Sequence, residues 1–113
     1  MSAEEILKKA QVLANDLENS ELYRSYCQNK KALLENENLL ERVRAYKSSQ
    51  CELETKRLEE GEVGFEEERR VAREYTELSL NPVANAYLAC EYEILRLYRE
   101  VLDVLCESCE IGV

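Results

Sequence analysis

Asn81-Pro82-Val83-Ala84 opens the stretch of sequence that decides the fold, and after Pro82 no Gly or Pro follows until Gly112. The Asn81 side chain can accept hydrogen bonds from the first free N–H groups of a helix, and Pro82 suits the first helical position because no N–H is needed there. Apolar residues then recur with a helical period that fits no strand: Tyr87, Leu88, Ile94, Leu95, Tyr98, Val101, Leu102 and Leu105. The stretch predicts a long amphipathic helix with a broad apolar side, which must pack against something else.

Four shorter helices are expected before this stretch, because capping residues and apolar periodicity alternate along the chain. Gly61-Glu62-Val63-Gly64 is the one clear turn, and it should fold the chain back on itself. The segment just before it, residues 47–60, is so polar that it should either project or pair with another helix. We expect the first helix to run from Ser2 to about Glu18 and the second from Ser20 to just before Asn36. The third should run from Asn36 to Gly61 and the fourth from about Phe65 to about Ser79.

The fold class predicted from these signals is all-α. Only 3 Gly and 1 Pro in 113 residues leave little room for the turns of a β-protein. We expect about five helices in an antiparallel bundle with a long C-terminal helix, as a single domain over residues 1–113.

The charge balance limits the kinds of partner. The chain has 24 acidic residues against 15 basic ones, a net charge of −9, so nucleic-acid phosphates and anionic membranes should be repelled. The sequence shows no signal peptide and no run of about 18 apolar residues, which predicts a cytoplasmic protein. In that compartment the five cysteines are expected to be thiols or metal ligands rather than structural disulfides.

Cys106 and Cys109 are the candidate metal ligands. They lie three residues apart, so on a helix they are neighbours that could share a metal or form a disulfide. A zinc site usually needs four ligands and the chain has no His, so a second chain or Cys90 would have to supply the rest. The alternative is that Cys109 is a small apolar packing residue and Cys106 an incidental thiol. Cys27, Cys51 and Cys90 stand alone, and we expect them to be buried thiols.

No catalytic constellation is visible in the sequence. The glutamates of Glu66-Glu67-Glu68 are consecutive, so they point in different directions around a helix instead of converging. Gly61-x-x-Gly64 lacks the Lys and Ser/Thr of a phosphate-binding loop. We therefore expect a protein that is not an enzyme.

Several short motifs occur in a characteristic order along nearly the whole chain. They are Ala10-x-x-Leu13-Ala14, Leu22-Tyr23-x-x-Tyr26, Tyr46-x-x-x-Gln50 with the closing Gly61, the Asn81-Pro82-Val83 break, and Tyr87-Leu88-x-x-Glu91 before a run of Leu and Val. In this order they resemble the YlbF/YmcA family of small bacterial helical proteins, also described as the control-of-competence YlbF domain.

The resemblance implies an all-α fold that associates with itself, with other family members or with RNA-processing proteins. It also implies a non-enzymatic regulatory role linked to competence, sporulation, biofilm formation and ribonuclease Y-dependent RNA processing. Complexes of this family are associated with iron–sulfur clusters, so the resemblance makes Cys106 and Cys109 hypothetical cluster ligands within a complex.

The residues themselves favour an interaction module that forms a dimer or larger oligomer. The apolar side of the last helix is broader than contact with one neighbour requires, so a second copy could cover the remaining flank. The expected interface residues are Leu88, Leu95, Tyr98 and Leu102. Two alternatives stay open: a cysteine-based metal or iron–sulfur redox sensor, and a purely structural helical adaptor.

Overall fold

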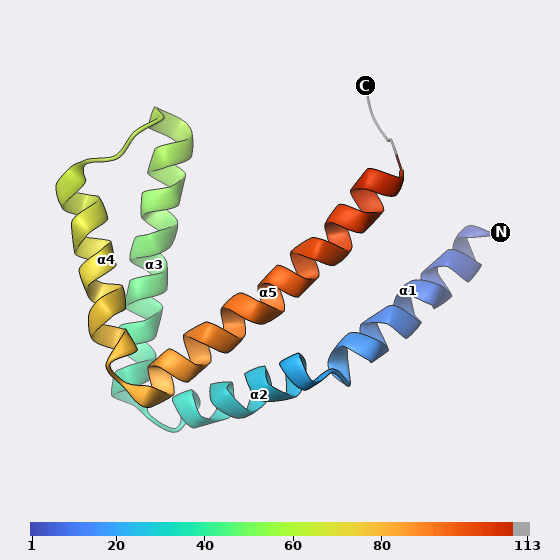
Figure 1. Ribbon diagram of the computed structural model, residues 1–113, viewed down its shortest axis with the longest axis horizontal. Coiled ribbons are helices and arrows are strands. Elements are labelled where there is room, and N and C mark those ends of the chain that lie inside the picture. The colour runs from blue at the N-terminus through green and yellow to red at the C-terminus, as the bar shows by residue number, and fades with distance from the viewer. Residues whose placement is uncertain (110–113) are drawn as a thin grey trace. The chain divides into compact units, whose positions relative to one another are not determined.

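The computed structural model describes residues 1–109, which form five helices and no strand (Figure 1). Their bounds are Ala3–Glu18 (α1), Glu21–Leu34 (α2), Glu37–Glu60 (α3), Phe65–Ser79 (α4) and Pro82–Ser108 (α5). The prediction of an all-α fold with a long C-terminal helix is confirmed. None of the helices in the described part is long and apolar enough to cross a membrane.

The predicted capping residues start the helices. Backbone N–H groups donate to Ser2 Oγ, Ser20 Oγ and Asn36 Oδ1 at 3.1–3.2 Å, in each case from three residues further on. Asn81 Oδ1 accepts from the N–H groups of both Val83 and Ala84, at 2.9 and 3.2 Å. Gly61 ends α3 in the left-handed conformation with φ of 81°, which a residue with a Cβ adopts only at a cost. Helix ends are therefore set by local sequence.

The chain divides into two compact units. The first, which we call the hairpin unit, is Lys30–Leu88. The second, which we call the terminal unit, combines Met1–Asn29 with the chain from Ala89 onward. Both boundaries fall inside helices, one in α2 and one in α5.

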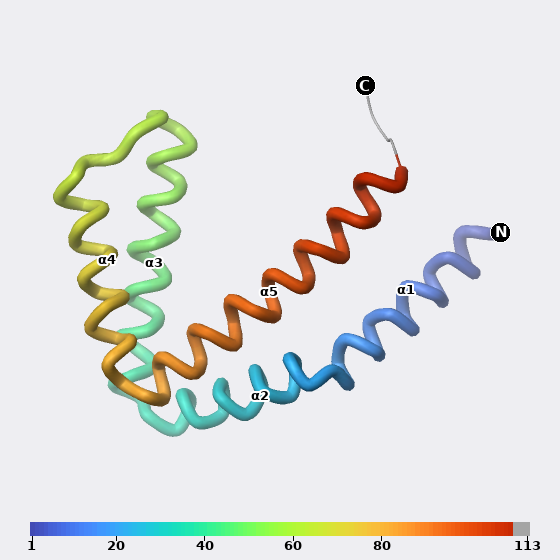
Figure 2. Tube along the Cα trace, in the orientation of Figure 1, coloured from blue at the N-terminus to red at the C-terminus, as the bar shows by residue number. Residues whose placement is uncertain are grey.

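The hairpin unit contains most of the buried apolar side chains. Its helices α3 and α4 run antiparallel side by side, joined by the short turn at residues 61–64 (Figures 1 and 2). The ring of Tyr46, in α3, lies 5.7 Å from the ring of Tyr75, in α4, centroid to centroid. The polar second half of α3 also pairs with α4, through ion pairs of Lys56 and Arg57, and this is one of the two arrangements expected. Nine of the ten buried apolar residues in the described chain belong to this unit: Leu33, Leu39, Val43, Tyr46, Leu53, Val71, Leu78, Ala84 and Tyr87.

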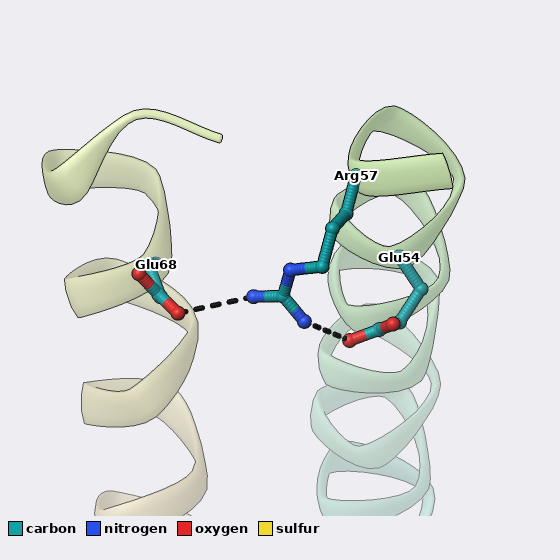
Figure 3. Close-up of polar contacts among 3 residues, drawn as sticks. All are labelled: Glu54, Arg57 and Glu68. Carbon is teal, nitrogen blue, oxygen red and sulfur yellow. Dashed lines mark hydrogen bonds and ion pairs between the residues drawn. The ribbon is translucent and has the colours of Figure 1, made fainter. Parts of the chain in front are cut away.

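Ion pairs connect the turn-proximal ends of α3 and α4. Lys56 Nζ lies 2.7 Å from Glu67 Oε1. The Arg57 guanidinium bridges Glu54 on its own helix and Glu68 on α4, at 2.7 and 3.0 Å (Figure 3). Because these groups are partly exposed, each pair contributes little to the stability of the hairpin.

The prediction of buried thiols is wrong for Cys27 and Cys51, which are both exposed. Cys90 is half-buried, and its Sγ accepts a hydrogen bond from Asn29 Nδ2 at 3.1 Å. Helical periodicity places a cysteine on a face of its helix, but it does not determine whether another helix covers that face.

Candidate partner-binding surface

Helix α1 is amphipathic in sequence yet buries none of its residues. Its apolar residues recur at helical spacing and so share one side of the helix. Among them, Ile6 is 55% exposed, Leu7 64% and Leu13 40%. An apolar stripe of this kind normally lies against a core, so the stripe of α1 lacks a covering partner.

The second half of α5 is uncovered in the same way. Ile94 is the single buried apolar residue of the described terminal unit. Leu95 and Leu102 are exposed by 57% and 60%, and Tyr98 and Leu105 are also exposed, although all four lie on the apolar side of the helix. We call the following set the terminal apolar surface: Ile6, Leu7, Leu13, Leu95, Tyr98, Leu102 and Leu105.

A hollow of about 380 Å³ lies within the terminal unit. It is lined by α1, α2 and α5, through Ala14, Leu17, Glu18, Tyr23, Tyr98, Val101 and Leu102. All but Glu18 are apolar or aromatic, which suits an apolar side chain presented by a partner. The hollow thus joins part of the terminal apolar surface into a concave site.

The predicted interface residues are distributed over both units. Tyr98 and Leu102 come together in the hollow, and Leu95 is exposed on the same helix. Leu88 belongs to the hairpin unit, where it is half-buried. Their role in binding stays a prediction. The contribution of α1 was missed at the level of sequence, although the apolar spacing of that helix was its signal.

Glu18, Tyr23 and Tyr98 supply the polar groups of the hollow. A hydrogen bond with the Cys27 side chain raises the pKa of Tyr23 above its ordinary value, and the nearby Glu18 and Tyr98 add to the effect. The phenol therefore stays neutral at physiological pH. Its ring lies 6.3 Å from that of Tyr26, centroid to centroid. The site can present an aromatic wall and a neutral hydroxyl to a partner.

Charged side chains and cysteines lie at or near the surface of the described chain. In residues 1–109 no carboxylate, amine or thiol is buried, and the buried titratable groups are the phenols of Tyr46 and Tyr87. Cys106 and Cys109 are exposed near the end of α5, and no group of three or more potential metal ligands occurs in the described chain. Because a typical cluster takes four cysteine ligands, these residues of one chain do not fit an iron–sulfur cluster by themselves. The ligand assignment stays a prediction that requires further donors.

Three bacterial proteins are similar to the chain over most of its length. A UPF0342 protein of Desulfitobacterium hafniense is 28% identical over 103 residues, which cover 91% of this chain and 83% of the relative. UPF0342 proteins of Caldicellulosiruptor saccharolyticus and Caldicellulosiruptor bescii are also 28% identical, over 88% and 87% of the chain and 82% of each relative. No solved structure is significantly similar to the chain.

The family model described as control of competence regulator ComK, YlbF/YmcA matches residues 6–109. The match starts within α1, runs to the last described residue and takes in both units. The chain therefore belongs to the YlbF/YmcA family of competence regulators.

Proposed function

We propose that this chain is a non-enzymatic regulatory protein that acts by binding other proteins, and that one of its partners is a second copy of itself. The supporting observation is the uneven distribution of the core. Nine of the ten buried apolar residues lie in the hairpin unit, whereas α1 buries none. The terminal apolar surface is the proposed contact.

The low stability expected for α1 on its own supports the proposal that a partner covers it. A helix of 16 residues is marginal in water unless an apolar face packs against something. Covering the exposed side chains of α1 and α5 would also remove apolar surface from water, at about 25 cal/mol per Å². Symmetric pairing of two identical surfaces would stabilise α1 and remove the apolar surface from water with one interface. It is also the commonest arrangement of soluble homo-oligomers.

Membership of the family supports the regulatory role. We infer that the chain modulates competence, sporulation, biofilm formation or ribonuclease Y-dependent RNA processing through its protein contacts. Other family members and RNA-processing proteins are the corresponding partners. The strongly acidic composition opposes direct contact with RNA, so the effect on RNA would pass through a bound protein.

Light scattering coupled to gel filtration tests self-association. The native protein should have about twice the 13.2 kDa mass of one chain. A Leu95→Glu/Leu102→Glu variant places two charges on the terminal apolar surface and should elute as a monomer with its helical content retained. Leu80→Glu is the matched control, because Leu80 is 81% exposed but belongs to the hairpin unit, and this variant should remain a dimer. A monomeric native protein, or equal dissociation of both variants, would contradict the proposal.

A further inference from the structure

The turn-proximal end of the α3–α4 hairpin concentrates negative charge. Residues 54–68 contain seven glutamates against one lysine and one arginine, a net charge of −5 out of −9 for the whole chain. Lys56 forms an ion pair with Glu67. Arg57 forms ion pairs with Glu54 and Glu68 (Figure 3). The remaining four carboxylates form no ion pair within the described residues: Glu59, Glu60, Glu62 and Glu66. The pKa of Lys56 is raised by its hydrogen bond with Glu67 and, to a smaller extent, by the charge of Glu60, so the negative charge in excess of these contacts is available to an external cation.

Two large apolar side chains are exposed among these carboxylates. Leu58 is 86% exposed and Phe65 72%, and they flank the turn from opposite helices. The hairpin core next to them is made by Leu53 and Val71, so neither exposed side chain is needed to hold the helices together. Arg69 lies 6.0 Å from the Phe65 ring centroid, over one side of the ring. We call Leu58, Phe65 and the four glutamates outside the ion pairs the hairpin tip.

We propose that the hairpin tip is a second docking surface, which binds a lysine- and arginine-rich segment of another protein that also carries an apolar side chain. The carboxylates of the tip complement the basic groups of such a segment, and Leu58 and Phe65 provide apolar contact at its centre. Apolar anchors surrounded by a polar rim are the usual arrangement of a protein interface.

Other occupants fit less well. Phosphates of nucleic acid and of anionic membranes would be repelled by the tip. A second copy of this chain offers Arg69, Arg70 and Arg73 as its nearest approach to a basic patch, but these follow Glu66-Glu67-Glu68 directly and precede Glu74. The tip therefore complements a more basic protein than this chain itself, and the proposed contact differs from the terminal apolar surface.

A synthetic amphipathic peptide of lysine and leucine is a suitable probe. Titrated into the isotopically labelled full chain at low salt, it should shift the backbone NMR signals around Leu58, Gly61 and Phe65 first. Leu58→Ala/Phe65→Ala should weaken binding about tenfold, whereas Leu80→Ala, at an exposed site outside the tip, should change the dissociation constant less than about twofold. Raising the salt concentration should weaken binding to the native protein.

A pair of charge-reversal variants separates a local site from the effect of net charge. Glu59→Lys/Glu62→Lys and Glu35→Lys/Glu41→Lys change the net charge equally, and all four positions are exposed. We expect the first to weaken peptide binding about tenfold and the second to weaken it about twofold. Equal losses in both, or NMR shifts centred on α1 and the second half of α5, would overturn the proposal. Loss of the native dimer in Leu58→Ala/Phe65→Ala would assign the tip to a contact between copies and would also overturn it.

Discussion

Replacing Asn81 by Ala should destabilise the protein by about 1–2 kcal/mol. In the structure Asn81 Oδ1 accepts two backbone hydrogen bonds, from Val83 at 2.9 Å and from Ala84 at 3.2 Å. Ala84 is fully buried, with 0% exposure, so water cannot replace the lost acceptor at its N–H group. This places the expected cost in the upper part of the usual range for a helix cap. The backbone hydrogen bonds of Asn81, to Leu78 and from Asn85, do not depend on its side chain.

Thermal and urea unfolding followed by circular dichroism measure this cost. For a unit of this size, the loss corresponds to a decrease in Tm of roughly 5–15 °C. Asn81→Asp retains an acceptor oxygen and adds a negative charge at a helix N-terminus, so it should keep most of the native stability at neutral pH. Asn85→Ala is the matched control on the exposed side of the same helix, and it should be neutral or slightly stabilising. If Asn81→Ala unfolded within about 0.3 kcal/mol of the native protein, or if Asn81→Asp were equally damaging, the capping argument would be refuted.

Three further predictions concern alkaline pH, the hairpin turn and the cysteine pair. Burial raises the pKa of Tyr46 above the ordinary 10.0, and Tyr75 and Glu74 add to this. Because the folded state favours the neutral phenol, the contribution of Tyr46 to the free energy of unfolding is complete below pH 10. It is lost as the pH rises through the higher pKa of Tyr46 in the folded state. Urea unfolding on both sides of pH 10 should show a steeper alkaline loss for the native protein than for Tyr46→Phe, and identical slopes would contradict this. Gly61→Ala should cost about 1 kcal/mol from its left-handed backbone alone, since an added Cβ meets nothing within 4 Å. Gly64→Ala is the control, because φ at Gly64 is −64° and the added Cβ would make ordinary contact with Glu67 at 4.0 Å. Its stability should be nearly unchanged in the same denaturation assay. If Cys106 and Cys109 are ligands, anaerobically purified native protein should contain iron or zinc that Cys106→Ser/Cys109→Ser lacks, and elemental analysis at background for the native protein would rule the ligands out.

The helices themselves could be predicted because their signals are local. Asn36 and Asn81 bond to N–H groups two or three residues away, and Gly61 adopts a conformation that its own lack of a Cβ permits. Apolar spacing then identifies the face of each helix that avoids water. Such interactions span a single helical turn, and the bounds of α4, Phe65–Ser79, agree with the expected limits.

The surfaces that bind partners could be predicted only in part. Tyr98 and Leu102 were expected at an interface because the apolar side of the last helix is broad, and the structure brings them into one hollow with Leu17 and Tyr23. The same reasoning predicted that Cys27 and Cys51 are buried, which is wrong. Periodicity gives the side of a helix on which a residue lies, whereas its exposure depends on contacts with residues far away in the sequence.

The sequence by itself determined the all-α class, the number of helices, their ends and the reversal of direction at Gly61, since each depends on hydrogen bonds and backbone preferences within a few residues. Only the tertiary structure decided that the buried side chains gather in Lys30–Leu88 while α1 and the second half of α5 remain uncovered. It also placed Leu58 and Phe65 outside the core of the hairpin, among glutamates that outnumber the two cations paired with them. Burial is a property of the whole arrangement of helices, because an apolar face can be covered by any of several neighbours or by none.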